Sequence, residues 1–126
     1  MAAFLDRKKR GKIKMRIYNV PDVSEHQPNF DFTPYAGKYA ILRAGVASRE
    51  DYSFRRHVSE CQRLGITIGV YFYSYALNTA QAIEEAQRFL SIINGVDIGL
   101  GVWLDMEDAD HYKVNNGVYI THDNIA

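Results

Sequence analysis

Residues 101–108 have the sequence GVWLDMED, a short apolar run that begins at a glycine and ends in carboxylates. Such a run is typical of a strand buried in a parallel sheet, and β/α proteins carry their chemistry at the carboxyl ends of these strands. Side chains alternate along a strand, so Trp103, Asp105 and Glu107 share one face. The stretch therefore predicts a buried strand that presents two carboxylates on the same side.

The spacing of Asp105 and Glu107 suits acid–base chemistry. Their Cα atoms are expected roughly 6.5 Å apart, close enough for one negative charge to raise the pKa of the other carboxyl group. A proton donor beside an ionised partner is what cleavage of a glycosidic bond requires. Acidic strand ends also form solvated loop entrances and helix caps, so the spacing alone leaves both interpretations open.

The remainder of the chain alternates between strand and helix patterns. Further strands are predicted over Arg16–Val23, Lys38–Gly45 and Ile66–Tyr73, and helices over Ser48–Gly65 and from Asn78 or Thr79 to Asn94. This alternation implies βαβ units and a parallel sheet, which is an α/β fold. A closed eight-stranded β/α barrel usually takes about 250 residues. With 126 residues the chain is expected to hold about the first four βα units.

Each predicted helix has an apolar face at helical spacing. The first carries Phe54, Val58, Cys61 and Leu64, with Asp51 placed to cap it, and the second carries Ile83, Ala86, Phe89, Leu90 and Ile93. Cys61 is the only cysteine, which excludes an internal disulfide. Its place on an apolar face favours a core role over a reactive thiol.

The charge of the chain divides it into two regions. Residues 1–16 hold seven Lys or Arg and one Asp, whereas residues 17–126 hold eight Lys or Arg and fourteen Asp or Glu. The basic segment is either an arm for an anionic surface or a disordered leader, and we predict a leader over 1–15 before a domain over 16–126. The acidic body argues against nucleic-acid binding. No membrane span and no secretory signal are predicted.

Four stretches of the chain, in order, resemble the Chalaropsis-type lysozymes of glycoside hydrolase family 25. Asp22–Gln27 (DVSEHQ) is similar to the family's D-V-S-x-[HY]-Q, Ile41–Gly45 to its second strand, Gly69–Ala76 to its G-x-Y-[HY]-[FY] strand, and Trp103–Glu107 to its W-[LV]-D-x-E. The resemblance implies a TIM-like β/α barrel of which this chain is the amino-terminal part. It also implies hydrolysis of the β-1,4 bond between N-acetylmuramic acid and N-acetylglucosamine in peptidoglycan.

The resemblance assigns roles to three carboxylates. Glu107 would be the general acid that protonates the glycosidic oxygen. Asp105 would position the substrate's acetamido group or stabilise positive charge at the anomeric carbon, and Asp22 would join them from another strand end. Whether the reaction retains or inverts the anomeric configuration, or uses the acetamido group as nucleophile, stays open because it depends on carboxyl separation.

Aromatic and cationic residues surround these acids in the sequence pattern. The candidates for substrate binding are Tyr71, Tyr73, Tyr75, Trp103 and Arg43. Aromatic faces with polar groups suit sugar rings, although the same residues also suit a barrel interior. Arg43 is expected either to reach a substrate carboxylate or to form an ion pair with Asp22 or Asp105.

The sequence also departs from the family pattern. Pro28 stands where the family usually has Gly, which makes a substrate role for His26 less certain than backbone contacts in its loop. The four histidines fall in separate segments without ligand spacing, so no metal and no cofactor are expected.

The family's later strands, one of which usually supplies another active-site Asp, are not in this chain. An alternative is therefore a non-catalytic half-barrel that binds cell-wall glycan or assembles with itself or a partner chain. The enzyme interpretation implies a lysin of phage or prophage type that stays in the cytoplasm until it is released onto the bacterial cell wall.

Overall fold

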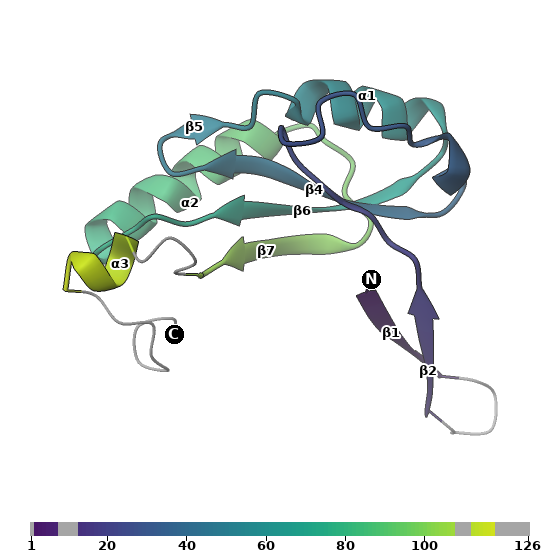
Figure 1. The fold of residues 1–126 in the computed structure, drawn as a ribbon, viewed down its shortest axis with the longest axis horizontal. Helices are drawn as coiled ribbons and strands as arrows, with labels where there is room; N and C mark the ends of the chain where they lie inside the picture. The colour runs from purple at the N-terminus through teal and green to yellow at the C-terminus, as the bar shows by residue number, and fades with distance from the viewer. Residues whose placement is uncertain (1, 8–12, 108–111, 118–126) are drawn as a thin grey trace.

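A parallel sheet forms the centre of the molecule, as seen in a computed structural model that describes residues 2–7, 13–107 and 112–117. Its path is β3 (Asp22–Val23), β4 (Tyr39–Val46), β6 (Thr67–Tyr73) and β7 (Gly101–Asp105), and each neighbouring pair is parallel. Figure 1 shows the arrows of β4, β6 and β7 side by side and pointing the same way. The α/β fold with a parallel sheet that the sequence predicted is confirmed.

Strand β4 carries two irregularities at its carboxyl end. Its register against β6 shifts between Arg43 and Gly45, which marks a β-bulge at Ala44. Beyond the bulge, the short strand β5 (Arg49–Glu50) folds back and pairs with β4 in the antiparallel direction. The chain therefore turns back at this end of the sheet before it enters the first helix.

The two long helices cover one face of the sheet. Helices α1 (Phe54–Arg63) and α2 (Thr79–Ile93) both lie above the strands in Figure 1, whereas the short α3 (Tyr112–Asn115) lies near the carboxyl ends of β6 and β7. A single 3-10 turn, Thr33–Tyr35, follows the β3 loop. Neither α1 nor α2 covers the opposite face of the sheet.

The hydrophobic core lies between the sheet and these helices. It contains Val23, Ala40, Leu42, Ala44, Phe54, Val58, Cys61, Val70, Phe72, Phe89 and Ile92 among its buried members. Burial raises the pKa of the Cys61 thiol to about 12, which fits a packed rather than a reactive cysteine. Because side chains alternate, Leu42, Val70 and Phe72 face the helices, and Arg43, Tyr71 and Tyr73 face the opposite side.

The predicted apolar face of the second helix is partly wrong. Phe89 is buried and Ile93 packs on the core, but Ile83 and Leu90 are more than half exposed. The buried side of α2 instead includes Ile92 and the carboxylate of Glu85. Helical spacing locates an apolar stripe, but it does not show which edge of that stripe a neighbouring sheet covers.

The first helix and the first strand are both shorter than predicted. Helix α1 starts at Phe54 rather than Ser48, because the preceding residues form β5 and the loop around Asp51. The strand predicted over Arg16–Val23 is divided into β2 (Ile13–Tyr18) and β3, with Pro21 just before β3. Proline cannot donate a ladder hydrogen bond, which favours a break at this point.

Regular structure also occurs where a disordered leader was predicted. Strand β1 (Ala2–Arg7) pairs with β2 in an antiparallel two-stranded sheet, from Ala2 opposite Tyr18 to Arg7 opposite Ile13. The alternation of apolar and basic residues over 13–17 fits a strand. The leader over 1–15 stays a prediction. The boundary of the domain at residue 16 stays a prediction.

Strand β7 is exposed rather than buried as predicted. Val102 is 52% exposed, Trp103 45% and Leu104 51%. In the described part of the chain β7 pairs with β6 on one side and ends the sheet on the other, so its outer edge has no neighbouring strand among those residues. The apolar run correctly predicted a strand, and its burial depends on a neighbour that the described residues do not supply.

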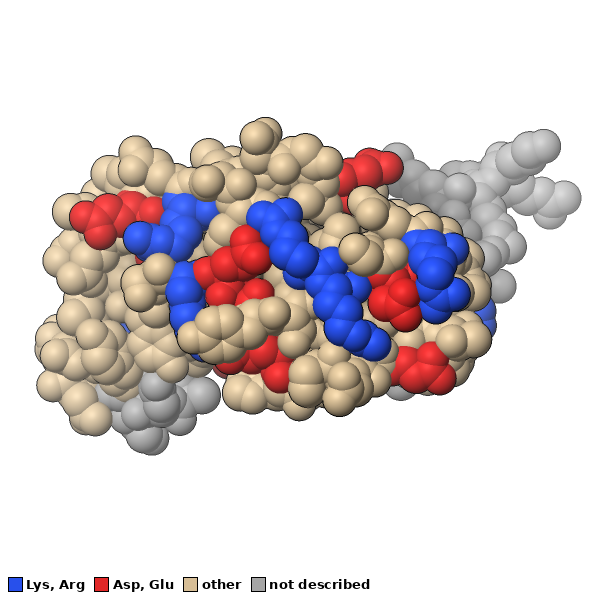
Figure 2. Space-filling model, turned by 90° about the horizontal axis from the view of Figure 1, so that it is seen from above, with Lys and Arg blue, Asp and Glu red and all other residues tan. Residues whose placement is uncertain are grey.

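The helix-covered side of the molecule carries charges of both signs. Figure 2 shows blue and red groups interspersed across this face. Helix α1 contributes to the ion pairs Arg55–Glu50 and Arg63–Glu60. A face of this kind is not a single-sign surface for a polyanion. Within the described ranges, no helix is long and apolar enough to cross a bilayer.

Candidate active site

Asp105 and Glu107 form a hydrogen-bonded pair at the carboxyl end of β7. Asp105 is the last residue of the strand, and Glu107 follows after one residue. The pKa of Asp105 is raised to about 6, by partial burial first and then by the charge of Glu107 and the hydrogen bond between the two side chains. A carboxyl group in this setting keeps its proton to a higher pH than an isolated one, because ionising it would place two negative charges side by side. The predicted proximity of the two acids is therefore present, although the raised pKa belongs to Asp105.

Asp22 belongs to β3, at the opposite end of the strand order from β7, and acts on the pair from there. It begins β3, and its negative charge also raises the pKa of Asp105. The phenol of Tyr71 on β6 is hydrogen-bonded to Asp22, and its pKa is raised by burial and then by that carboxylate. Three acids from two segments, the start of β3 and the end of β7, thus converge on the face of the sheet opposite the helices.

Trp103 lies on the same face. A Cβ atom added at Gly69 would be 2.4 Å from Trp103 Cζ3, so the indole ring rests directly on that glycine of the neighbouring strand. The register places Tyr73 of β6 opposite Asp105 of β7. The side-chain alternation expected from the sequence therefore places Trp103, Tyr73 and Asp105 on one face of the sheet, as the structure does.

Tyrosines continue this surface beyond the ends of the strands. The ring centroids of Tyr73 and Tyr75 are 5.3 Å apart, and those of Tyr75 and Tyr112 are 5.2 Å apart. Tyr112 belongs to α3 and was not among the sequence candidates. These three tyrosines, called the tyrosine group below, lie in a row that starts beside Asp105.

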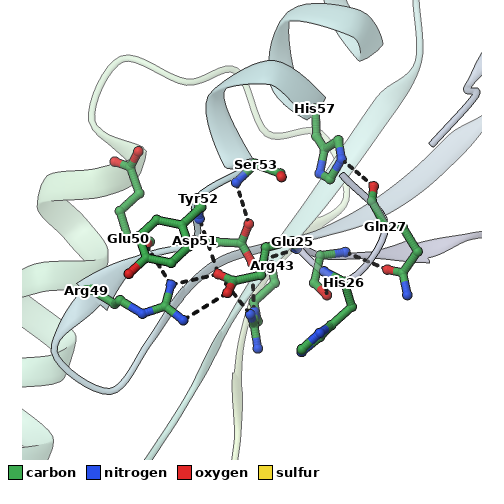
Figure 3. A network of polar contacts seen from close by, with 11 residues as sticks. Glu25, His26, Gln27, Arg43, Arg49, Glu50, Asp51, Tyr52, Ser53 and His57 are labelled. Atoms are coloured by element: carbon green, nitrogen blue, oxygen red, sulfur yellow. Dashed lines mark hydrogen bonds and ion pairs between the residues drawn. The ribbon is translucent and has the colours of Figure 1, made fainter. Parts of the chain in front are cut away.

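Arg43 is held by two carboxylates other than those expected. Its Nε donates to Asp51 Oδ2 at 2.8 Å, and its guanidinium lies 3.2 Å from Glu25 Oε1. Asp51 is almost completely buried, and its Oδ1 accepts from the backbone N–H of Ser53 at the start of α1. Figure 3 shows dashed lines that join Arg43 to both acids. Of the two roles left open by the sequence, the ion pair is present, with Glu25 and Asp51 in place of Asp22 and Asp105.

Glu25 joins the loop after β3 to the loop before α1. Arg49 contacts both of its oxygens, at 2.6 and 2.9 Å, and the backbone N–H of Tyr52 donates to Oε1 at 3.2 Å. These contacts lower the pKa of Glu25 to about 2, with the Arg49 hydrogen bonds as the largest cause. The loop that follows Asp22 is thereby fixed to the body of the domain.

Lys113 is a residue near the acids that the sequence argument missed. It is buried, its Nζ donates to the backbone carbonyl of Glu107 at 3.0 Å, and its charge lowers the pKa of Asp105. It therefore opposes the effects of burial and of the other acids. A lysine in a polar loop carries no sequence signal for such a role, because the contact depends on how the loop folds back.

The two histidines in the first half of the chain, His26 and His57, make hydrogen-bond contacts within the protein. His26 is exposed, and its backbone N–H donates to Ser24 Oγ at 3.2 Å. His57 is buried, lies 3.0 Å from the carbonyl of Gln27, and has its pKa lowered by burial. No group of three or more His, Cys, Asp or Glu suited to a metal ion occurs in the described part of the chain.

A hollow of about 400 Å³ lies at the other end of the sheet. It is lined by Val58, Cys61, Gln62, Gly65, Ile66, Thr67, Ile68, Asp97 and Gly99. This region surrounds the amino end of β6, and the acids lie at the carboxyl end of the neighbouring strand. The hollow is therefore separate from the candidate active site.

Parallel strands with acidic groups gathered at their carboxyl ends are the arrangement of β/α-barrel enzymes. The sequence profile of Glycosyl hydrolases family 25 matches residues 21–124, which include every acid and aromatic residue of the candidate site. The chain belongs to Glycosyl hydrolases family 25. The resemblance noted from four short motifs is thereby confirmed.

Solved structures with the same fold include an autolysin and an endolysin. The modular autolysin LytC from Streptococcus pneumoniae aligns with a TM-score of 0.63 and 23% identity over 84% of this chain and 28% of that one. The same autolysin in complex with a synthetic peptidoglycan ligand aligns with a TM-score of 0.62 and 21% identity over 100% and 31% of the two chains.

The catalytic domain of endolysin ply40, from bacteriophage P40 of Listeria monocytogenes, aligns with a TM-score of 0.59 and 19% identity over 79% of this chain and 59% of that one. The chain thus spans between about a quarter and three-fifths of the length of these structures. No curated protein sequence matches it. At these identities the structural likenesses establish the fold.

Proposed function

We propose that the chain carries the acidic half of a peptidoglycan muramidase that hydrolyses the β-1,4 bond between N-acetylmuramic acid and N-acetylglucosamine. Membership of Glycosyl hydrolases family 25 supports glycosidic bond cleavage as the reaction. The fold is shared with an autolysin that has been solved with a synthetic peptidoglycan ligand, which supports the substrate class. The bacterial cell wall would be the place of action.

The observation that carries this proposal is the contact between Asp105 and Glu107 at the carboxyl end of β7, where the pKa of Asp105 is raised to about 6. In the proposed reaction the proton held by the pair passes along their hydrogen bond to Glu107, the more exposed of the two, which gives it to the glycosidic oxygen as the bond to the anomeric carbon breaks. The ionised Asp105 then stabilises the positive charge that develops on the sugar, or orients the acetamido group that does so. Water completes hydrolysis at the anomeric carbon and restores the proton.

The remaining groups of the site would bind the glycan. Trp103 and the tyrosine group present aromatic faces to sugar rings, and hydroxyls of the same tyrosines can pair with sugar hydroxyls. Tyr71 would hold Asp22 at a set distance from the acid pair. Arg43 is given no substrate role in this proposal, because Asp51 and Glu25 occupy its guanidinium.

The experiment is release of reducing sugar ends from purified peptidoglycan. The 126-residue chain is compared with its Glu107→Gln variant and with a version extended by the later strands of a family 25 domain. Glutamine keeps the size of the side chain and removes the proton, so we expect activity to fall at least about a hundredfold. Glu84→Gln, an exposed glutamate on α2, is the matched control and should leave the rate unchanged.

A second candidate is a glycan-binding half-barrel without catalytic activity. It is favoured by the exposure of β7, which leaves the acids beside an open sheet edge rather than inside a closed barrel. Activity in the short chain that Glu107→Gln abolishes would remove this candidate. Binding of peptidoglycan by both chains with no release of reducing ends in either would put it first.

A further inference from the structure

Glu85 is a buried carboxylate outside the group of acids described above. It lies in α2, on the side of the helix that packs against the sheet, and is 6% exposed. Its neighbours on that side, Phe89 and Ile92, are apolar. Burial of a carboxylate costs free energy unless its oxygens are hydrogen-bonded, and an apolar residue of the same size would pack here at lower cost.

Both oxygens of Glu85 accept hydrogen bonds from the segment that follows β6. Oε1 accepts from Ser74 Oγ at 2.6 Å, and Oε2 accepts from the backbone N–H of Tyr75 at 2.8 Å. Ser74 is itself buried, and its Oγ accepts from the N–H of Ala76 at 3.2 Å. A carboxylate from the helix therefore fixes the path of the chain as it leaves the sheet.

The fixed segment connects the acids to the tyrosine group. The backbone N–H of Ser74 donates to the carbonyl of Asp105 at 3.0 Å. On the other side, Tyr75 stands between Tyr73 and Tyr112 in the tyrosine group. A shift of this short segment would change the position of the middle tyrosine relative to Asp105.

We propose that Glu85 is a positioning residue that holds Tyr75 beside the acid pair and so shapes the surface on which the glycan chain lies. The proposal rests on the proposed function, because it assigns the tyrosine group to glycan binding. Glu85 acts through Ser74 and Tyr75 and does not touch the substrate. Its loss should therefore weaken glycan binding much more than the chemical step.

Two substitutions separate this role from simple packing. Glu85→Met keeps the volume and removes both acceptors. Glu85→Gln keeps both contacts, because the amide oxygen can accept from Tyr75 N–H while the amide NH₂ donates to Ser74 Oγ. A positioning role thus predicts that Gln restores what Met loses. The test needs a kinetic and a structural measurement.

The kinetic measurement uses soluble glycan strands of alternating N-acetylmuramic acid and N-acetylglucosamine as substrate. The enzyme is the 126-residue chain or the extended version, whichever releases reducing ends in the assay above. We expect Glu85→Met to raise KM about tenfold with kcat within about twofold, since misplaced binding groups weaken the complex. Glu85→Gln should stay within about twofold in both constants. An unchanged KM in a folded Glu85→Met protein would overturn the proposal.

The structural measurement is hydrogen exchange at the Tyr75 amide in the 126-residue chain, which requires no activity. We expect Glu85→Met to lose protection at this amide while the amides of β4 and β6 keep theirs, and Glu85→Gln to retain it. Retained protection in the Met variant would overturn the proposal. If that variant does not fold, Ser74→Ala tests the same contact, and unchanged KM there would count against the proposal.

The two proposals fail in different ways. If wild-type protein releases no reducing ends in either length, the proposed function fails, while the exchange result still decides whether Glu85 fixes Tyr75. If Glu107→Gln abolishes activity and Glu85→Met leaves KM unchanged, the proposed function stands and the role of Glu85 is refuted.

Discussion

The pKa of Asp105 is determined by groups that come from different parts of the chain. Burial at the end of β7 and the charges of Glu107 and Asp22 raise its pKa, and Lys113 lowers it. The spacing of the D-x-E motif predicted the contribution of Glu107, and the resemblance to the family's first motif supplied Asp22. Lys113 could not be predicted, because its effect depends on a loop that returns to Glu107.

We expect the raised pKa of Asp105 to make the protein less stable as pH rises from about 4 to 6. The folded state binds the proton more tightly than the unfolded chain, so its stabilisation is complete below the unfolded pKa and is lost as pH passes the folded value near 6. Solvent screening limits the effect to about 1 kcal/mol. Urea unfolding at several pH values should show this slope, and Asp105→Asn should remove it. A slope that is the same in both proteins would refute this assignment.

The contact between Gly69 and Trp103 makes a second prediction for single residues. Gly69→Ala places a methyl group 2.4 Å from the indole ring, so the ring must move. Because Trp103 is partly exposed, we expect a cost of only about 1–2 kcal/mol in the free energy of unfolding, with a shift of tryptophan fluorescence. In a Trp103→Leu background the same substitution should cost less, because only the close contact with Leu100 Cβ at 3.2 Å then remains. Equal costs in the two backgrounds would mean that the ring is not the obstacle.

Among the elements, the contacts of Arg43 connect β4 with the loop after β3 and the start of α1. The side chain of Arg43 is 9% exposed and that of Asp51 is 0% exposed, whereas Arg49 is 37% exposed. Both arginines contact Glu25, so they form a matched pair that differs chiefly in burial. The buried one should matter more for stability.

We expect Arg43→Met to lower the free energy of unfolding by about 3–5 kcal/mol, because Asp51 is left charged in a buried site. Arg49→Met should cost about 1 kcal/mol or less, since water reaches its partner. Urea denaturation of the two variants at pH 7 measures the difference. Similar losses would indicate that Asp51 has other partners that compensate for Arg43.

For the strands and helices, the sequence correctly predicted the features that depend on local residue patterns. Apolar runs located β4, β6 and β7, and capping and turn residues located α2, whose Asn78 accepts from the N–H of Gln81. The exposed side of α2 was misassigned because apolar spacing does not specify the position of the sheet. Glu85 was missed for a related reason, since a glutamate in a helix normally faces water.

The same limit applies to the candidate site. Alternation within β6 and β7 placed Tyr71, Tyr73, Trp103 and Asp105 on one face, because strand parity is local. The partners of Arg43 were mispredicted because Glu25 and Asp51 lie in loops, whose paths are set by tertiary contacts. Local periodicity thus predicts the face of a strand better than the partner of a charge.

For the whole molecule, the main consequence of the sheet order is an apolar edge at β7. Val102, Trp103 and Leu104 are all about half exposed, and β7 has β6 as its pairing partner within the described residues. Unpaired apolar edges favour association between copies of a protein. We therefore expect the 126-residue chain to self-associate as its concentration rises.

Substitutions in β7 test this expectation. Leu104→Lys should reduce the sedimentation-derived mass at high concentration, because a charge on an edge strand disfavours pairing, whereas Leu104→Ile should leave the mass unchanged. A wild-type chain that stays at the 14.4 kDa monomer mass over a hundredfold concentration range would refute self-association.

The separation of the two faces of the sheet also bears on how the gene can change. On β6, Phe72 belongs to the core and its neighbour Tyr73 to the candidate site, so inserting or deleting one codon within the strand would exchange them. Such a change would place a phenol in the core and a phenylalanine beside the acids. The bulge at Ala44 shows that β4 accommodates a single extra residue at its end. Length variation among natural relatives should therefore occur at strand ends and loops, while the interior of β6 keeps its length.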